Sequence, residues 1–435
     1  MLDTKKNIGF TTNNLNVLLF IFIPYTLVFS IFLTEVILLI ISFLSLKKNI
    51  SKLKKLFIEN NLLKILLIFY LIIIFSSIYN QSKLEIILKN LAYIRFIFYA
   101  ISISWILNEF EYLKKYFLFS LISCYLLLFF GSIYEVLLKK YCITFDSNTV
   151  ANFTGDFKIC SKKYYIGNLI RPDRISSFFG DEMIVGSFVS RVLPLVCFLI
   201  FDQISNLNKR IIIFILIFFV SSTIIILSGE RVSFFYLIIF SLIFLFCIHI
   251  RYKYVLLTLL TLSLYLIISS STILKDRIYH QTYSQIFQEG GGIKFFSKEH
   301  QSHAESALKI FKDNPIIGIG PKNYRYECRK EKYNISKYSC TSHPHNFYIQ
   351  LLSEIGILGL LIPLIILINI FVYFLKTLNK KLTIKSHNLE IKKIFIYISF
   401  LITFFPLIPT GNIFNNWLSI IFYLPLGFFI NLNKK

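Results

Sequence analysis

Three arginines stand at unusual places in this sequence, inside long apolar segments or at their borders. Arg191 lies within one apolar segment, Arg231 opens another, and Arg174 belongs to the polar stretch Arg171–Glu182 in front of the first. A guanidinium group stays charged and is costly at membrane depth, so each position calls for a partner or a ligand. Surface anchoring of Arg231 and pairing of Arg191 with Glu182 are the structural interpretations. The functional interpretation is a diphosphate site, because a guanidinium can bind phosphate oxygens in a bidentate manner.

A second group of candidates is His343-Pro344-His345-Asn346, at the mouth of a later apolar segment. In a helix, Asn346, Gln350 and Ser353 fall on one stripe with Glu354 at its edge. A polar stripe that runs into an apolar segment predicts a lined cavity. The neutral imidazole of the second histidine could act there as a general base on a hydroxyl group. A capping or core role is the alternative for this histidine.

The sequence favours no metal and no cofactor. His343 and His345 lack a third ligand at metal spacing, and Cys340 is better placed for a disulfide. Gly290-Gly291-Gly292 lacks the Lys-Ser/Thr pair that completes a phosphate-binding loop. The chain also has no dinucleotide-binding glycine fingerprint and no nucleophile elbow, so ATP-driven transport has no support.

The composition determines which elements must position these groups. The chain has 435 residues, of which 56% are hydrophobic and only 16% charged, and its formal net charge is +23. This apolar content excludes disorder, and apolar runs of this length are atypical of a soluble enzyme. The basic residues lie in short groups between apolar runs rather than on a soluble domain, which argues against nucleic-acid binding. The pattern predicts an all-α integral membrane protein.

We count twelve apolar segments and expect about twelve transmembrane helices. Lysine-rich loops follow every second segment, so the positive-inside rule places both termini in the cytoplasm. The first helix has no cleavage site and is expected to remain uncleaved. The segments run approximately over 15–46 (two helices, split by Pro24 and a polar break near Thr34), 62–79, 86–107, 116–138, 184–201, 211–227, 232–250, 254–271, 347–375, 394–408 and 417–430.

This count divides the chain into 1–138 with five helices, an outer loop over 139–183, helices over 184–271, a larger outer loop over 272–346, and three helices over 347–435. Within the larger loop, Ala304, Leu308 and Phe311 predict an amphipathic helix over 300–313 that could lie on the bilayer surface. Each loop carries two cysteines close in sequence. Local disulfides Cys142–Cys160 and Cys328–Cys340 are possible if the loops face an oxidising compartment, and four free thiols are the alternative.

Several motifs resemble those of bacterial O-antigen ligases and polymerases. His345-Asn346, followed after nine residues by Gly356-Ile-Leu-Gly359, is similar to the His-Asn and Gly-x-x-Gly motif of the ligases. The stretch from Phe311 through Pro315, Gly318 and Gly320 resembles a second motif of the superfamily. Arg174 with Phe179-Gly180-Asp181-Glu182 is similar to the region before the sixth span of the polymerases, and Ser228-Gly229-Glu230-Arg231 to the start of the eighth. The resemblance covers about residues 170–375.

The resemblance implies a metal-independent glycosyltransferase at the outer face of a bacterial inner membrane. Its donor would be a glycan on undecaprenyl diphosphate, and its acceptor another lipid-linked repeat unit for a polymerase or lipid A–core for a ligase. No cofactor is expected, and a chain-length regulator and a flippase are possible partners, together with membrane lipid. The large outer loop has no Arg-x3-Leu motif of the ligases, which favours the polymerase reaction. A flippase or secondary transporter is the rival from another class, although no repeated halves are found, and a non-catalytic membrane scaffold is a third option.

The resemblance also implies roles for individual residues. The expected catalytic residues are His345, Arg231 and Arg191; the expected substrate-binding residues are Arg171, Arg174, Glu182, Asn346, Gln350 and Glu354; and the expected structural residues are Pro315, Gly318, Gly320, Gly356 and Gly359.

Overall fold

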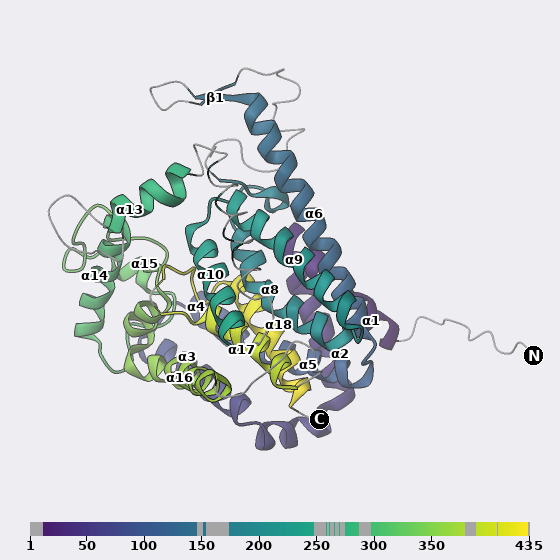
Figure 1. Cartoon of the computed structure of the whole chain (residues 1–435). Coiled ribbons are helices and arrows are strands. Elements are labelled where there is room, and N and C mark those ends of the chain that lie inside the picture. The colour runs from purple at the N-terminus through teal and green to yellow at the C-terminus, as the bar shows by residue number, and fades with distance from the viewer. Residues whose placement is uncertain are drawn as a thin grey trace, which may run out of the picture.

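The computed structural model describes residues 12–145, 151–153, 174–247, 275–286, 297–378, 389–406 and 408–433, together with positions 258, 261, 265 and 269. Helices make up nearly all the regular secondary structure among these residues (Figure 1). The other regular element among them is a short antiparallel hairpin in which β1 (Ile143–Phe145) pairs with β2 (Ala151–Phe153). The fold class predicted from the sequence is therefore correct for the described part.

The N-terminal helices are α1 (Thr12–Phe29), α2 (Ile31–Glu59) and α3 (Asn61–Tyr79). The chain breaks between α1 and α2 at Ser30, not near Thr34 as predicted. Ser30 has an extended backbone and its side chain accepts a hydrogen bond from the Leu33 amide, which is a helix N-cap. The predicted break at Pro24 is absent, since α1 continues through that residue.

The middle of the chain forms α4 (Leu84–Leu91), a 3₁₀ turn η1 (Ala92–Ile94), α5 (Arg95–Glu109) and α6 (Leu113–Cys142). After the first long loop follow the 3₁₀ turn η3 (Ser177–Phe179), α8 (Val185–Gln203), α9 (Leu207–Leu227) and α10 (Arg231–Cys247). The remaining elements are the π-helical turn η4 (Asp276–His280), α13 (Gln281–Ile286), α14 (Lys298–Asp313), α15 (Tyr324–Glu327), α16 (Phe347–Leu378), α17 (Leu389–Thr403) and α18 (Asn416–Leu432).

Six of the described helical segments are long and apolar enough to cross a membrane: Asn61–Tyr79, Leu84–Glu109, Leu113–Lys139, Val185–Gln203, Leu207–Leu227 and Phe347–Thr377. Shorter apolar helices run over Leu15–Phe29, Arg231–Phe246 and Asn416–Leu432. Most of the predicted segments coincide with a helix. The segment 254–271 falls outside the described residues, apart from four isolated positions. Twelve spans, the domain division and the cytoplasmic termini stay predictions.

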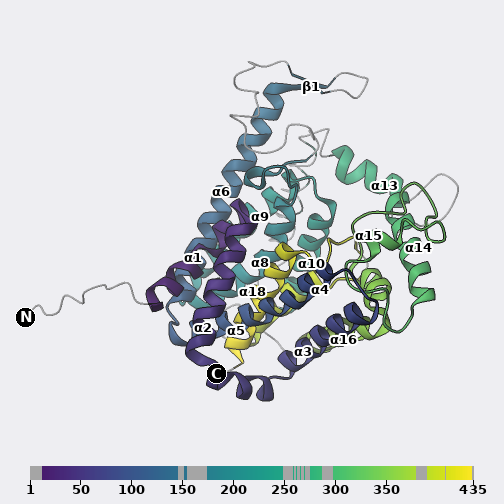
Figure 2. The same cartoon turned by 180° about the vertical axis from the view of Figure 1, so that it is seen from behind.

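Helix α8 is at the centre of the bundle. Its apolar window is 89% buried, more than any other candidate span among the described residues, and it contacts α6, α9, α10 and α17. Helices α3 and α16 lie side by side away from α1 and α2, and α14 and α15 gather near the start of α16 (Figures 1 and 2). The central position of α8 explains how the bundle can hold Arg191 away from lipid.

The predicted amphipathic helix exists as α14, but the prediction chose the wrong face. Its buried residues include Ala304 together with His303, Ala307 and Ile310, whereas Leu308 is exposed. The small side chains on the buried face let α14 approach α16, which it contacts. Helix α14 therefore packs against protein through this face instead of lying on a bilayer surface with it.

Candidate functional site

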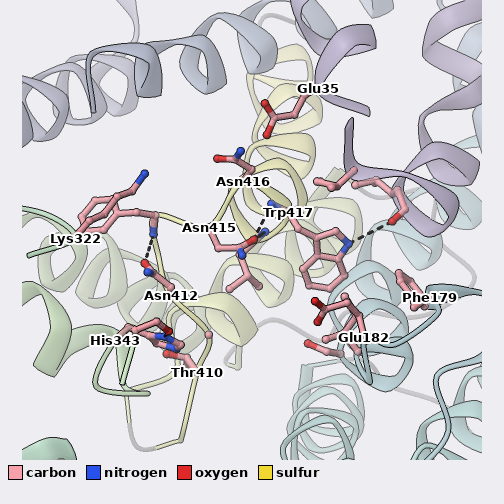
Figure 3. A pocket seen from close by; sticks show the side chains of 18 of the residues that line it. Glu35, Phe179, Glu182, Lys322, His343, Thr410, Asn412, Asn415, Asn416 and Trp417 are labelled. Carbon is pink, nitrogen blue, oxygen red and sulfur yellow. Dashed lines mark hydrogen bonds between the residues drawn. The ribbon is translucent and has the colours of Figure 1, made fainter. Parts of the chain in front are cut away.

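A cavity of about 1450 Å³ opens where the long loops meet the ends of several helices. Its lining comes from segments far apart in sequence: the junction of α1 and α2, α4 and α5, the residues before and within α8, α14, the residues around α15, and a continuous run over 409–418 before and at the start of α18. Trp417 lies in the middle of the lining, with His343 and Thr410 on one side of it and Glu182 and Phe179 on the other (Figure 3). A cavity of this size accommodates more than one small polar group.

Four histidines converge at one end of the site. The ring centroid of His345 lies 4.2 Å from that of His343, 5.1 Å from that of His300 and 5.4 Å from that of His303. His300 and His303 come from α14, and the other two from the loop before α16. The backbone of His345 has a φ of +54°, a left-handed conformation that is uncommon for a histidine. His300, His343 and His345 line the cavity.

The histidine cluster favours neutral imidazoles. Burial, with further contributions from the neighbouring imidazoles, lowers the pKa of His345 to about 3. Burial is also the main cause that lowers the pKa of His343 to about 4. The pKa values of His300 and His303 are lowered in the same way, mainly by burial. At neutral pH the cluster thus presents uncharged rings, which can accept a proton or a hydrogen bond.

Arg174 and Arg191 line another part of the cavity, together with Glu182 and Glu230. The Arg191 Nη1 atom donates to the Ser187 carbonyl at 3.3 Å and to its hydroxyl. The guanidinium lies over the Tyr236 ring, 4.9 Å from its centroid. Contacts with Ser187 and Tyr236, rather than the pairing with Glu182 considered as a structural interpretation, therefore hold this side chain.

Glu230, rather than Glu182, is the carboxylate beside the arginines. Its Oε1 lies 4.0 Å from the Arg174 Nη2 and accepts a hydrogen bond from the Gly186 amide at 2.9 Å. Its Oε2 accepts a hydrogen bond from the Ser233 hydroxyl at 3.1 Å. Burial raises the pKa of Glu230, against the opposing effect of Arg174. This end of the cavity therefore combines two guanidinium groups with carboxylates.

Arg231 begins α10, as the sequence predicted for the start of its apolar segment. It is not among the residues that line the cavity, whereas its neighbours Glu230 and Val232 are, and its catalytic role stays a prediction. It lies near enough to His300 to contribute to the lowering of that histidine's pKa, after burial and His303. Arg171 falls outside the described residues.

The polar stripe on α16 is part of the structure beneath the cavity and does not line it. Asn346, Gln350 and Glu354 are all buried. The Asn346 amide donates to the Pro406 carbonyl at 2.9 Å. The Gln350 amide donates to Asn412 Oδ1 and to Glu354 Oε2, both at 2.9 Å. These contacts hold Pro406 and the segment that contains Asn412, so the three predicted substrate-binding residues support the segment that faces the cavity.

Helix α16 is broken at Gly356. At this break, two of the motifs noted in the sequence contact each other: the stretch through Pro315 and Gly318, and the Gly-x-x-Gly motif that begins at Gly356. Gly356 has φ +72° and ψ −165°, and a Cβ there would lie 2.3 Å from the Ile316 carbonyl oxygen. In return, the amide of Ile357 donates to the Pro315 carbonyl at 2.9 Å. Since an interrupted helix needs substitute partners for its backbone groups, the loop at 315–320 supplies them.

The two remaining glycines of that loop have the same explanation. Gly318 has φ +71°, and a Cβ there would lie 2.4 Å from the Glu354 carbonyl carbon. Gly320 has φ +91°, and its amide donates to the Glu354 carbonyl at 2.8 Å. Gly359 differs, because a Cβ there would meet only the side chain of Ile355 in its own helix. The structural role expected for Gly359 therefore has no contact with a neighbouring element behind it.

A disulfide links Cys328 to Cys340, as the sequence suggested, and their Cα atoms are 5.2 Å apart. It ties the end of α15 to the segment that leads to His343. The other predicted pair, Cys142–Cys160, falls on side chains outside the described part of the chain. Within the described residues, no group of three or more histidine, cysteine, aspartate or glutamate side chains is arranged to hold a metal ion.

The sequence interpretation missed several residues of the site. Arg95 stands in the middle of a predicted apolar segment, so the argument applied to Arg191 could have found it. His300 and His303 share a face of the predicted amphipathic helix, which was also a usable signal. No local pattern singled out Trp417 or Lys322, which reach the cavity only through the fold.

Comparison with known families gives an independent result. Residues 216–364 match a family model described as O-antigen ligase. No match was found among curated proteins. The matched region includes α10, the histidine cluster and the broken start of α16. The match covers about a third of the chain and supports the resemblance to the O-antigen ligase/polymerase superfamily that the sequence motifs indicated.

Proposed function

We propose that this membrane protein transfers a glycan from a polyprenyl diphosphate to an acceptor hydroxyl inside the cavity, at the outer face of a bacterial inner membrane. The observation that carries the proposal is the presence of a guanidinium pair and a neutral histidine cluster in one cavity. Arg174 and Arg191 line it together with His300, His343 and His345. A group transfer from a diphosphate needs both a cationic site for the leaving group and a group that removes the acceptor proton.

The arginine end is suited to the donor. The Arg174 and Arg191 guanidinium groups are arranged in a partly buried setting where charge interactions are stronger than in water. As the bond between the anomeric carbon and the phosphate oxygen breaks, its electron pair goes to the diphosphate. The two guanidinium groups stabilise that added charge.

The histidine end is suited to the acceptor. The acceptor oxygen attacks the anomeric carbon, and its proton goes to the neutral imidazole of His345. A pKa of about 3 makes this histidine by itself a weak base. The anionic donor raises that pKa, because an opposite charge nearby favours the imidazolium form. Proton transfer is thereby coupled to donor binding, and a single displacement of this kind inverts the anomeric centre.

Polymerisation of lipid-linked repeat units is the reaction we favour, on the absence of an Arg-x3-Leu motif from the large outer loop. Transfer to lipid A–core is the alternative with the same donor chemistry. The surface-glycan ladder of a deletion strain separates them. Loss of a polymerase leaves single repeat units on the core, whereas loss of a ligase leaves bare core and accumulated lipid-linked chains.

The test of the site uses His345→Asn, since asparagine tolerates a left-handed backbone better than most residues. We expect the rate of transfer in reconstituted vesicles to fall by about 10²- to 10⁴-fold, the usual contribution of a general base. His280→Asn is the matched control, because His280 is exposed and does not line the cavity. Full glycan synthesis by the His345 variant at normal protein levels would refute the assignment.

A further inference from the structure

The cavity contains basic side chains that the donor site does not use. Lys89 and Arg95 come from α4 and α5, Arg325 comes from α15, and Lys322 comes from the turn just before it. All four line the cavity, and none belongs to the arginine pair assigned to the donor. Their effect on the pKa of Lys322 shows that the other three lie within electrostatic range of its ammonium group.

The new group and the arginine pair lie at different ends of the cavity. Figure 3 shows Lys322 and His343 on one side of Trp417 and Glu182 on the opposite side. The Arg174 Nη2 donates to the carbonyl of Met183, the residue after Glu182, so the arginine end lies on that opposite side. Arg325 contributes to the lowered pKa of His343, after burial, so this basic group adjoins the histidine cluster. It is therefore next to the place where the acceptor hydroxyl must react.

Two of the four cations already have carboxylate partners. The Arg95 Nη2 lies 3.5 Å from Glu35 Oε2 and donates to Asn416 Oδ1 at 3.1 Å. Lys89 forms an ion pair with Glu85 one turn earlier in α4. The positive charges of these two side chains are therefore balanced by carboxylates of the protein.

Lys322 and Arg325 are not compensated in the same way. In the part of the chain that the structure describes, no ion pair or hydrogen bond is recorded for the Lys322 ammonium. The Nε of Arg325 is buried without a hydrogen-bond partner. A buried donor without an acceptor costs free energy. An anion that accepts hydrogen bonds from these two side chains would therefore stabilise them.

The backbone holds Lys322 in a strained position. Its φ of +65° is a left-handed conformation that few residues with a side chain adopt. The turn is fixed on both sides. The Gly320 backbone amide donates to the Glu354 carbonyl at 2.8 Å, and the Asn323 Nδ2 donates to Ser82 Oγ at 2.8 Å. Strain that the surrounding structure maintains in this way is typical of functional positions.

The electrostatics point in the same direction. Burial, with smaller contributions from Lys89, Arg95 and Arg325, lowers the pKa of Lys322 to about 8. The ammonium is thus less well solvated than a surface lysine and is repelled by these three cations, an effect that Glu354 only partly offsets. An anion at this position would reverse both effects.

We infer that Lys322 and Arg325 form a second anion site, which binds a phosphate group of the acceptor while the donor diphosphate occupies the Arg174 and Arg191 end. The identification of the ligand as an acceptor rests on the proposed function. Phosphate is the shared chemistry of the two acceptors under consideration, since a lipid-linked repeat unit carries a diphosphate and lipid A–core carries phosphates. The site would orient the acceptor so that its hydroxyl meets the histidine cluster.

The first experiment counts binding sites for inorganic pyrophosphate on the purified full-length protein, by equilibrium dialysis at low ionic strength. We expect two sites in the unmodified protein and one in the double variant Lys322→Gln with Arg325→Gln. Arg191→Gln should lose the other site. The matched control, Arg329→Gln with Lys330→Gln, removes the same charge from exposed neighbours and should keep both sites.

The outcomes separate the two proposals. Two sites in the Lys322 and Arg325 double variant would overturn the second anion site, as would a single site in the unmodified protein that only Arg191→Gln removes. Conversely, a site that only the double variant removes, with no effect of Arg191→Gln, would support the second site while refuting the donor assignment.

The second experiment measures KM in reconstituted vesicles with each acceptor in turn. We expect the double variant to raise the acceptor KM by about tenfold or more, as for the loss of one charge-assisted contact, and to leave the donor KM unchanged. A rise for the lipid-linked repeat unit assigns the phosphate to the carrier lipid, and a rise for lipid A–core assigns it to the core. An unchanged KM for both acceptors would overturn the inference.

Discussion

Acidification should destabilise the outer part of this protein through the histidine cluster. The folded-state pKa values are about 4 for His343 and about 3 for His345, both below the ordinary value of 6.5. At pH values below about 6.5 the unfolded chain therefore binds more protons than the folded chain. The contribution of these residues to stability is fully present above pH 6.5 and is lost as the pH falls toward their folded-state pKa values.

The size of the effect follows from the shifts. One pKa unit corresponds to about 1.4 kcal/mol, so at about pH 5 each of the two histidines costs about 2 kcal/mol and the pair about 4 kcal/mol. His300 and His303 add to the loss, because their pKa values are lowered as well. The charged groups facing the cluster act in both directions. Glu299 favours protonation of His300 and His303, while Arg231 opposes it at His300 and Arg325 at His343.

The assay is hydrogen exchange over residues 297–346 in detergent-solubilised protein between about pH 7 and about pH 5, with exchange corrected for its intrinsic pH dependence. His343→Gln should reduce the loss of protection by about half of the pair's share. His280→Gln, at an exposed position, should leave it unchanged. Protection that is independent of pH over this range, or an unaltered slope in His343→Gln, would refute the reasoning.

Three further outcomes can be measured. Gly356→Ala should destabilise the protein by more than Gly180→Ala. Both glycines have a positive φ, which costs another residue about 1–3 kcal/mol, but only Gly356 faces backbone atoms within 2.7 Å of the new Cβ. Equal thermal shifts would contradict this. Replacing Cys328 by serine should cost about 3 kcal/mol of local stability around the histidine loop, from the entropy of a 12-residue separation, and reductant should reproduce the effect in hydrogen exchange. Glu230→Gln should tighten pyrophosphate binding about fivefold, since it removes a charge beside Arg174 that is worth about 1 kcal/mol, and weaker binding would contradict the placement of the anion.

Hydropathy alone was sufficient to locate most of the helices, because apolar runs of this length have few alternatives in a membrane. It was not sufficient for their ends. The break between α1 and α2 depends on the side chain of Ser30 capping a helix, which no hydropathy window detects. The orientation of α14 depends on which residues let α16 approach, and there the small Ala307 is buried while the larger Leu308 is exposed.

Residues of the candidate site could be predicted where the residue type itself is unusual for its segment. Arg191 in an apolar segment and His345 before one are such cases, and both line the cavity. Lys322 and Trp417 obey the rules of their own segments, since a lysine in an outer loop and a tryptophan at a membrane boundary are ordinary. They become functional candidates only because the fold brings segments from the two ends of the chain to one cavity.

Left-handed backbone conformations near the polar stripe of α16 give its buried polar groups a structural role. Gly318, Gly320, Lys322, His345 and Gly356 all have left-handed backbones, and all belong to the segment between Pro315 and the break in α16. Conformations of this kind persist only where surrounding contacts maintain them. The buried Glu354 carboxylate supplies one such contact, since its Oε1 accepts a hydrogen bond from the Tyr324 backbone amide at 3.2 Å, two residues after Lys322. The Thr410 amide donates to the His345 carbonyl at 2.8 Å, from the segment that Asn346 and Gln350 hold. The polarity of the stripe inside an apolar helix therefore has a structural cause, and the turns it supports carry a lysine and a histidine that line the cavity.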